Sequence, residues 1–301
     1  MNYASHDQFE SPVNALFRSM GAGGVYARTG LFERTVDGLS ALISRYRVPG
    51  TEVFNFPPVM SRAQLERSGY LKSFPHLLGC VCCLRGEDPD TRATVARLGP
   101  GQQWVSAQSA TELVLTPAAC YPLYPLVAAR GRAPGGGLQF DVMCNCFRRE
   151  STYEVGRLQS FRMREYVCIG SPEQVVDFRQ RWMVRAKEFA DLLALPHRIA
   201  SASDPFSGRA AKFLAVSQLA QELKFELLIP VNSVQNPTPC MSFNYLRDHF
   251  GTTWGIETAA GNVAHTSCVG FGMDRLALAL FATHGIDIGA WPKRVREAIP
   301  L

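Results

Sequence analysis

The sequence predicts an α+β fold with a mostly antiparallel sheet flanked by helices. Helix-like segments come first, and a strand-rich stretch then runs from about Cys80 to Val167 without helices alternating between its strands. Strict alternation of strands and helices would instead predict a parallel sheet. The chain has 301 residues, of which 47% are hydrophobic and 19% charged, so it can build a sizeable core.

The N-terminal elements follow from hydrophobic spacing and from Gly and Pro breaks. Apolar residues recur at helical intervals in two segments, which glycines 21, 23 and 24 separate, and Pro49-Gly50 ends the second. The expected elements are helices over residues 13–19, 31–47 and 62–68 and a strand over residues 51–56. We therefore expect residues 1–50 to form a helical segment packed on a core domain of residues 51–301.

The later elements are predicted by strand composition and by one strong helix start. A helix is expected to start at Ser171, whose side chain can cap it. Pro172 suits the first helical turn, and the negative charge of Glu173 suits the positive end of the helix. This helix is expected to reach about Leu195. Runs of β-branched and aromatic residues are typical of strands. The remaining expected elements are strands over residues 113–116, 140–147, 161–169 and 225–231 and helices over residues 208–223 and 274–283.

Composition excludes several classes of protein. The net charge is +5, from 31 basic and 26 acidic residues, and no run of like charge suggests a nucleic-acid-binding tail. No apolar stretch reaches the roughly 20 residues of a membrane span, and the polar N-terminus lacks the layout of a signal peptide. We expect a cytoplasmic protein without a membrane partner, in which the 9 cysteines are mostly reduced thiols.

The first candidate site is Phe147-Arg148-Arg149-Glu150, which ends an apolar strand and leads through a long polar loop to a strand beginning near Phe161. Arg148 and Glu150 are two residues apart, so on a strand their side chains share one face. Arginine binds phosphate through parallel hydrogen bonds, a carboxylate accepts from an amine, and an aromatic ring stacks on a flat base. The structural alternative is a surface Arg–Glu pair on a hairpin.

The second candidate site is Gly270-Phe-Gly-Met-Asp-Arg275, which runs from a strand directly into an apolar helix. Glycines in a strand let a ligand or another backbone approach closely. Arg275 falls in the first helical turn, where its guanidinium is expected to meet a phosphate. The structural alternative is a buried joint between strand and helix.

Together, the two patterns resemble motifs 2 and 3 of the class II aminoacyl-tRNA synthetases, in the order and at the separation of that family. Pro58 stands where motif 1 of the family has its dimer-forming proline, and residues 58–74 and 115–123 are most similar to the seryl enzymes. The resemblance covers roughly residues 50–285. It implies the class II synthetase catalytic fold, ATP with magnesium, and a homodimer.

One departure from the common seryl enzymes points to a metal. Cys120 stands where they carry a glutamate, which resembles the methanogen-type enzymes, whose zinc ion is held by Cys, Glu and Cys and binds the free amino group of the substrate. The resemblance implies zinc on Cys120, Glu165 and Cys268, with a fourth position open to the substrate. Taken alone, these cysteines would be buried small hydrophobes. The other thiol clusters, Cys80-Val-Cys82-Cys83 and Cys144-Asn-Cys146, are expected to pack structurally.

The expected substrates follow from a narrower resemblance. Seryl-tRNA synthetases carry a large N-terminal tRNA-binding module, whereas about 50 residues without sustained heptads precede the motif 1 strand here. This resembles the amino acid:[carrier protein] ligases, truncated homologues of the methanogen-type catalytic domain. That family adenylates glycine or alanine, a choice the sequence leaves open, and transfers it to the phosphopantetheine thiol of a carrier protein rather than to tRNA. The resemblance implies carrier docking on a helix within residues 204–223, with Arg209 and Lys212 facing an acidic carrier.

The resemblance also assigns the ATP contacts. Arg148 and Arg275 hold the phosphates, and Glu150 contacts adenine or the amino acid's amine. The loop and the return strand supply the remaining contacts of this part of the site, which are Arg157, Leu158 and Phe161.

The magnesium side and the amino-acid side are less regular. Where the seryl pattern has an acidic metal ligand, this chain has Thr238-Pro-Cys-Met-Ser242, so Glu226 and Ser242 are the candidates beside ATP. Glu150, Glu165 and Asp204 are expected around the amino acid.

Three other functions stay open from the sequence. A complete serine-charging enzyme would need a partner that supplies the tRNA module. A non-catalytic regulatory paralogue would not need the intact arginines and glutamate. A zinc hydrolase would need a general base near the metal, and no HExxH-like helix is present.

Overall fold

A seven-stranded sheet organises the computed structural model, which describes residues 15–97, 104–150 and 156–299. Only the first pair of strands is parallel, and all the other neighbours are antiparallel. The predicted α+β class with a mostly antiparallel sheet is therefore confirmed. In spatial order the strands are β3 (Glu52–Phe56), β7 (Leu138–Phe147), β8 (Ser160–Gly170), β12 (His265–Gly272), β11 (Thr238–Arg247), β10 (Lys224–Ile229) and β9 (Arg198–Ser201).

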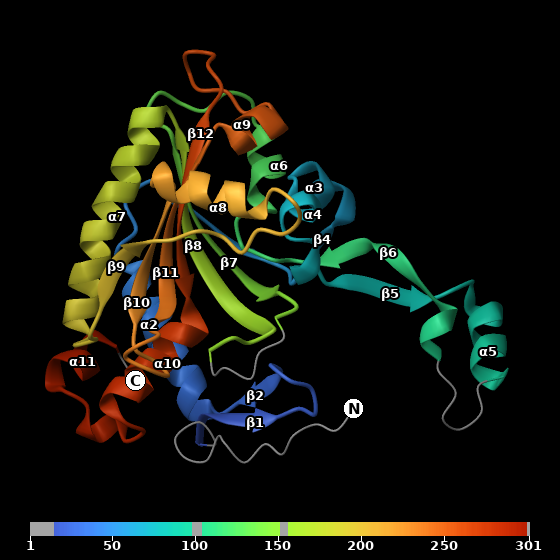
Figure 1. Ribbon diagram of the computed structural model, residues 1–301, viewed down its shortest axis with the longest axis horizontal. Coiled ribbons are helices and arrows are strands. Elements are labelled where there is room, and N and C mark those ends of the chain that lie inside the picture. Colours follow the sequence, from blue (N-terminus) through green and yellow to red (C-terminus); the bar gives the residue numbers. More distant parts are fainter. Residues whose placement is uncertain (1–14, 98–103, 151–155, 300–301) are drawn as a thin grey trace.

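Three helices cover one face of this sheet (Figure 1). They are α2 (Gly30–Ser44), α7 (Pro172–Leu192) and α10 (Met273–His284), and the short α11 (Lys293–Ala298) packs against α7. The predicted start of α7 is confirmed, because the Ser171 side chain accepts from the Gln174 amide while Gln174 bonds back to the Ser171 amide. Within the described residues, no helix combines the length and the apolar composition needed to cross a bilayer.

The N-terminal segment corrects one expectation. Residues 13–19 were expected to be helical, but Phe17–Ser19 form strand β1, which pairs with β2 (Tyr26–Arg28) across the glycine-rich turn; residues 13 and 14 lie outside the described residues. The Phe17 ring packs at a tilt against that of Phe32 on α2, with 4.7 Å between the ring centroids. The hairpin buries this ring in the core, and such tertiary contacts override weak helical spacing.

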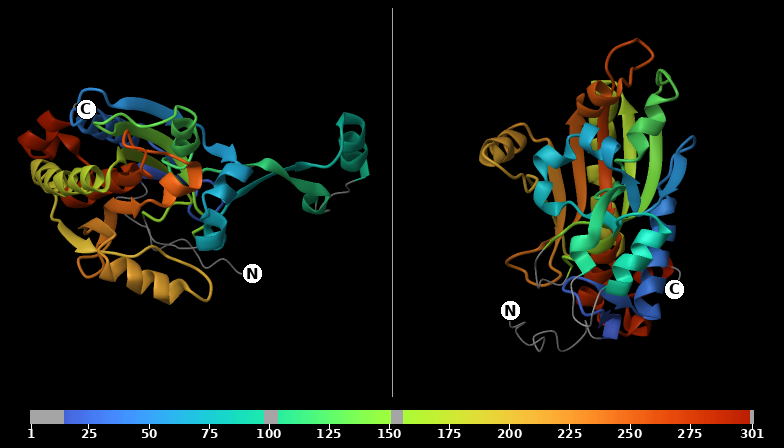
Figure 2. Two further views of the ribbon diagram at one scale, coloured as in Figure 1. Left: turned by 90° about the horizontal axis from the view of Figure 1, so that it is seen from above. Right: turned by 90° about the vertical axis from the view of Figure 1, so that its right-hand side faces the viewer.

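The other face of the sheet carries a second core and the candidate site. Tyr124 of α6 (Leu123–Ala128) stacks on Phe250 of α9 (His249–Trp254) at 3.8 Å between ring centroids. Helix α8 (Ala211–Ala220) has no buried residue and stands away from the body (Figure 2). The remaining short elements near this face are α3 (Arg62–Arg67), α4 (Tyr70–Ser73) and η2 (Pro75–Leu77), whereas η4 (Ile288–Ala290) packs beside α10 on the opposite side.

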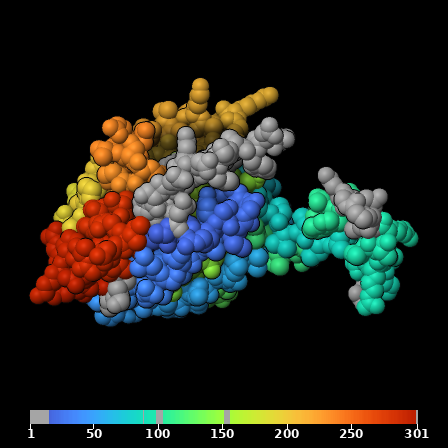
Figure 3. Space-filling model, turned by 90° about the horizontal axis from the view of Figure 1, so that it is seen from below, coloured from blue at the N-terminus to red at the C-terminus, as the bar shows by residue number. Residues whose placement is uncertain are grey.

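A narrow arm projects from the body beside this face (Figures 1 and 3). A small sheet of order β4 (Val59–Ser61), β6 (Gln108–Leu115) and β5 (Cys80–Leu84) forms its base, and α5 (Asp88–Arg97) and η3 (Trp104–Ala107) lie at its far end. Val95, Trp104 and Val105 are more than half exposed, at 53%, 52% and 59%. The arm therefore contributes little to either core.

Candidate functional site

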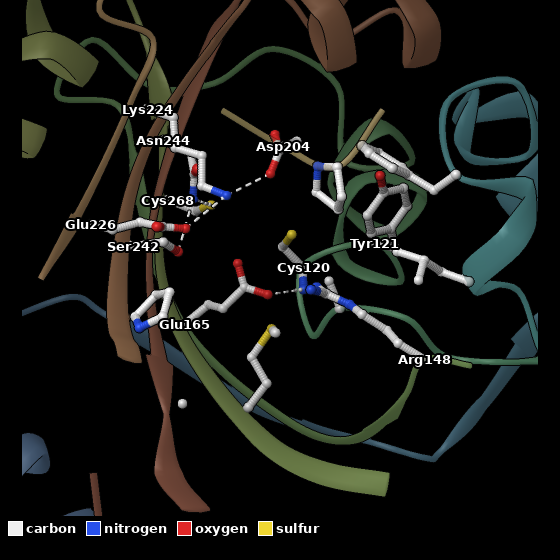
Figure 4. A pocket seen from close by; sticks show the side chains of 18 of the residues that line it. Cys120, Tyr121, Arg148, Glu165, Asp204, Lys224, Glu226, Ser242, Asn244 and Cys268 are labelled. Carbon is white, nitrogen blue, oxygen red and sulfur yellow. Dashed lines mark hydrogen bonds and ion pairs between the residues drawn. The ribbon is translucent and has the colours of Figure 1, made fainter. Parts of the chain in front are cut away.

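A cavity of about 400 Å³ opens on the sheet face opposite α7 and contains nearly all of the predicted site residues (Figure 4). Of those residues, only Arg157 is not part of its lining. The predicted residues in the lining are Cys120, Arg148, Glu150, Leu158, Phe161, Glu165, Asp204, Glu226, Ser242, Cys268 and Arg275.

Strand register explains why residues far apart in sequence meet in the cavity. Across neighbouring strands, directly opposite residues point to the same face, and residues two apart on a strand share that face. One row joins Lys224, Asn244 and Cys268 on β10, β11 and β12. The next row joins Glu226, Ser242, Gly270 and Glu165, from β10 to β8.

Gly270 leaves room for the second row. A Cβ at this position would lie 2.9 Å from the Ser242 hydroxyl oxygen and 3.9 Å from Cγ of Glu165. Any larger residue would push one of these two side chains away from its place. The glycine noted in the sequence thus permits the close approach of Ser242 and Glu165.

The thiol end of the cavity consists of Cys120, Glu165 and Cys268. One ligand atom from each lies within 4.8 Å of the other two, and each residue is at most 4% exposed. The backbone amide of Cys120 donates to Oε1 of Glu165 at 3.0 Å, which fixes the carboxylate and leaves its second oxygen for another partner. Asn244 donates to the sulfur of Cys268 at 3.4 Å.

The chemistry of the thiol end fits a divalent cation that takes sulfur and oxygen ligands. The hydrogen bond with Cys268, burial and the nearby Glu165 carboxylate together raise the pKa of Cys120 well above that of an ordinary thiol. A cation bound beside the Cys120 sulfur would reverse that effect and favour the thiolate. Two thiolates and one carboxylate form a zinc donor set that leaves one tetrahedral position open.

The arginine end of the cavity consists of Arg148 and Arg275, each anchored by backbone carbonyls. Nε of Arg148 donates to the Pro117 carbonyl at 2.9 Å. Arg275 donates through Nε to Gly156 at 2.7 Å and through Nη1 to Pro239 at 2.9 Å. A guanidinium has five N–H donors, so each arginine is oriented and still has donors left for an anion. Burial lowers the pKa of Arg275, and an anionic ligand would offset that cost.

Glu150, Phe161, Arg157 and Leu158 surround the arginine end. The Arg148 guanidinium lies 5.5 Å from the centroid of the Phe161 ring, a cation–π distance. Arg157 lies outside the cavity lining and forms an ion pair with Glu150 at 3.3 Å. Leu158 is buried and lines the cavity. The two guanidinium groups and the flat ring form a surface suited to an anionic, aromatic ligand.

A charged trio lies beside the thiol end (Figure 4), and of its members the sequence predicted Asp204 and Glu226 as site residues but not Lys224. The Lys224 ammonium contacts Asp204 at 2.6 Å and Glu226 at 3.1 Å. Lys224 and Glu226 are two residues apart, a spacing that places both side chains on one face of a strand. This spacing could have predicted that Lys224 lies beside Glu226. Asp204, the third member, comes from a loop that no sequence pattern brings there.

Tyr70 is another lining residue that the sequence did not single out. Its hydroxyl is buried and has no hydrogen-bond partner in the described structure. Burial raises its pKa to about 12, so the hydroxyl keeps its proton and acts as a donor. An unpaired buried hydroxyl facing a cavity is a candidate ligand contact.

Cys240 also lines the cavity, and the thiol clusters noted in the sequence lie outside it. Cys144 and Cys146 are buried on β7, whereas the three cysteines of β5 are exposed on the arm. His265, near Cys268 in sequence, contacts the Tyr245 hydroxyl at 2.6 Å. Among the described residues, the thiol end is the one cluster of three or more acidic, thiol or imidazole ligands with metal-binding geometry.

Known proteins resemble this chain over most of its length. Residues 104–284 match the model of the "tRNA synthetase class II core domain (G, H, P, S and T)". Two curated proteins of Bradyrhizobium diazoefficiens, amino acid--[acyl-carrier-protein] ligases 1 and 2, are 59% and 57% identical over 98% of this chain and 90% and 88% of their own lengths.

More distant matches are to seryl enzymes. The type-2 serine--tRNA ligase of Methanopyrus kandleri is 27% identical over 62% of this chain and 37% of its own length. The crystal structure of A. aeolicus tRNASec in complex with M. kandleri SerRS matches with a TM-score of 0.76 and 21% identity, over 94% of this chain and 58% of that one. At that identity the structural likeness shows the fold alone.

Proposed function

We propose a reaction for this chain from the premise that it belongs to the amino acid--[acyl-carrier-protein] ligases, which are built on the class II tRNA synthetase core. The expected class II catalytic fold is confirmed by the same family. The proposed reaction activates an amino acid with ATP and transfers it to a carrier protein. The observation that carries it is one cavity that contains a cluster of two thiols and a carboxylate at one end and two anchored arginines at the other.

The first step forms an aminoacyl adenylate. A carboxylate oxygen of the amino acid attacks the α-phosphorus of ATP, and the bond to the β-phosphate oxygen breaks to release pyrophosphate. Arg148 and Arg275 stabilise the charge that develops on the phosphates, because their anchored guanidinium groups need no reorganisation. Glu150 orients adenine or the substrate amine, and Phe161 stacks on the adenine ring.

The second step transfers the aminoacyl group to sulfur. The phosphopantetheine thiol attacks the carbonyl carbon of the adenylate, the bond to the phosphate oxygen breaks, and AMP leaves as a thioester forms. The thiol proton is released to solvent or to AMP.

We propose that Cys120, Glu165 and Cys268 hold one zinc ion. In this place zinc supplies a Lewis acid that binds the free α-amino group of the substrate, which restricts the pocket to amino acids. The residues of the second row would limit the room beside that group, which favours glycine or alanine. Magnesium would accompany ATP, with Glu226 and Ser242 as the nearest candidate ligands.

The proposed carrier site is α8, which presents an exposed apolar surface beside basic residues. Phe213 and Val216 are 74% and 64% exposed, unusual values for large apolar side chains on a short helix. Arg209 and Lys212 precede them and suit an acidic carrier. We also propose a homodimer through the edge strand β3 and the following Pro58, as the class II resemblance implies.

The test is ATP–pyrophosphate exchange against a panel of amino acids, followed by transfer assays. Exchange with glycine or alanine and labelling of a pantetheinylated carrier are expected. Exchange with serine and labelling of tRNA would support tRNA charging instead. Absence of exchange with every amino acid, in a protein that holds its zinc, would support a regulatory paralogue.

A further inference from the structure

The segment of residues 202–207, here called the strap, crosses the open face of the large sheet between β9 and α8 (Figure 1). Asp204, Pro205 and Phe206 of the strap line the cavity. At its far side, Phe206 stacks on Phe74 at 5.5 Å, and the Ser207 amide donates to the Ser73 carbonyl at 3.1 Å. The strap thus spans the cavity from the edge of the sheet to α4.

Asp204 is the inner attachment of the strap. Its Oδ1 accepts from the Lys224 ammonium at 2.6 Å, and its Oδ2 accepts from the Gln218 amide group at 2.9 Å. The backbone amide of Asp204 donates to the side-chain oxygen of Gln218 at 2.7 Å. Three contacts therefore converge on one residue that belongs to no helix or strand.

Lys224 connects this attachment to the rigid part of the molecule. It lies on β10 within the large sheet, is 8% exposed, and shares its row with Asn244 and Cys268. An ammonium so far from water must keep its anionic partners, because an unpaired buried charge is costly. Lys224 consequently holds Asp204, and with it the strap, at a fixed place beside the thiol end (Figure 4).

The outer end of the strap is held by neutral contacts, the Phe206–Phe74 stacking and the Ser207–Ser73 hydrogen bond, rather than by an ion pair. Gly208, which follows it, has a φ of +86°, and a Cβ built there would meet nothing within 4 Å. Arg209 is exposed, and α8 beyond it has no buried residue. The charged attachment of the strap therefore lies inside the cavity, and the chain directly after the strap is open to solvent.

We infer that Lys224 is a positioning residue that latches the strap over the thiol end through Asp204, so that the bound amino acid and its adenylate are kept from water. This rests on the proposed function of the cavity. In the reaction that the latch suppresses, a water oxygen attacks the carbonyl carbon of the adenylate and the bond to the phosphate oxygen breaks. AMP and the free amino acid are released together with a proton. A closed site protects reactive intermediates from such hydrolysis.

The kinetic test compares Lys224→Met with Lys224→Arg and with the exposed control Lys293→Met. In Lys224→Met, the KM for the amino acid is expected to rise roughly tenfold or more, because the substrate is positioned less precisely. The KM for ATP is expected to change less than about twofold. AMP release without carrier is expected to increase for each adenylate formed. Lys224→Arg is expected to restore most of both values, and Lys293→Met to match the unsubstituted protein.

A second measurement reads the latch without any reaction. Trypsin cleaves after Arg209, in the exposed chain directly after the strap, and cleavage is expected to be several-fold faster in Lys224→Met and in Gln218→Leu. Gln218 lies on a helix without buried residues, so this variant keeps its core even if Lys224→Met folds poorly. Peptide mass fragments identify the cut.

The outcomes separate the latch from the proposed function. Unchanged amino-acid KM, unchanged AMP release and unchanged cleavage after Arg209 would overturn the latch while exchange activity persisted. Equal rises in the KM for both substrates would show a general structural defect and also overturn it. If the unsubstituted protein shows no exchange but the variants are cleaved faster, the proposed function fails and the latch on the strap stands.

Discussion

The thiol end and the arginine end of the cavity are built by different means. Two of the three residues of the thiol end lie on adjacent strands, where register places Cys268, Glu165 and their neighbours in two rows of one sheet face, and Cys120 comes from the turn before α6. The arginine end lies where β7 ends and α10 begins, and its two arginines are oriented by backbone carbonyls. A sheet face fixes side chains that must converge on a small target, whereas anchored long side chains suit an extended anionic ligand.

The largest effect is expected from a variant that removes a ligand from the thiol end. In Cys268→Ser, the zinc content is expected to fall from one per subunit toward zero. Exchange activity is expected to fall more than about a hundredfold, which exceeds the loss caused by mutating residues that only hydrogen-bond to metal ligands. Metal analysis and exchange assays on the same samples give both values. Cys83→Ser, an exposed cysteine of the arm, is the matched control and should keep both. Full activity in a zinc-free Cys268→Ser sample would refute the metal's role.

The next effect breaks the arginine end. Arg275→Lys is expected to lower kcat of exchange about a hundredfold, because lysine offers a single point charge and cannot bond Gly156, Pro239 and a phosphate together. Zinc content should stay at one per subunit, which separates the two ends. Arg181→Lys, an exposed arginine on α7, should leave the kinetics unchanged. A loss of zinc in Arg275→Lys would contradict the independence of the two ends.

A smaller effect is expected from a substitution within the sheet, which tests whether the thiol end can be altered separately from the arginine end. Gly270→Ala places a Cβ 2.9 Å from the Ser242 oxygen, so the row beside Glu165 must shift. We expect the KM for the amino acid to rise roughly tenfold, an effect of about 1.4 kcal/mol, and the KM for ATP to rise less, since Ser242 is also a candidate magnesium ligand beside ATP. Gly135→Ala is the control, since a Cβ there meets nothing within 4 Å. Equal changes in the two KM values would show that the ends are not separable.

A smaller effect is expected where the nucleotide ring would lie. Phe161→Leu removes an aromatic face that the Arg148 guanidinium approaches to 5.5 Å. Aromatic and cation–π contacts are each worth about 0.5–1.5 kcal/mol, so the KM for ATP should rise a few-fold. The KM for the amino acid serves as the internal reference and should not change.

The smallest expected effect concerns pH. Burial alone would raise the pKa of Asp204, but Lys224 and Gln218 lower it below its ordinary value. The contact of Asp204 with Lys224 therefore stabilises the fold fully above the unfolded pKa of about 3.9. It is lost only as pH falls through the lower pKa of the folded state. Burial alone would lower the pKa of Lys224, but Asp204 and Glu226 raise it above its ordinary value. The contact of the Lys224 ammonium therefore stabilises the fold fully below the unfolded pKa of about 10.4. It is lost as pH rises through the higher pKa of the folded state. The rate of cleavage after Arg209, normalised to a peptide standard, should therefore stay flat between about pH 5 and pH 9. A steep change within that window would contradict the latch.

The fold was predictable wherever an element has one buried face. Helices α2, α7 and α10 and strands β3, β7, β8 and β10 lie at their expected positions, whereas strands β9 and β11 of the large sheet were not predicted. Helix α5 was missed because it lies on the projecting arm and shows no apolar stripe. The helix expected over 13–19 was wrong at Phe17–Ser19 because pairing with strand β2 decides the conformation there.

The site was predictable in part, and the limit has a physical origin. Motif residues such as Arg148 and Arg275 stand in fixed local patterns, so the sequence alone singled them out, and the structure places both at one end of the cavity. Lys224 has no such pattern, because its importance depends on Asp204, which reaches it from the strap. Tyr70 is a similar case, since only packing shows that its hydroxyl is buried without a partner.

The three exposed cysteines of the arm give the molecule two chemically distinct sets of thiols. Cys80, Cys82 and Cys83 face solvent on β5, whereas the other six cysteines are buried. A maleimide dye applied briefly should therefore label the arm first and spare the cysteines of the cavity. The arm then carries a fluorescent reporter of its surroundings, and the same exposure makes it the place where air oxidation will cross-link one molecule to another.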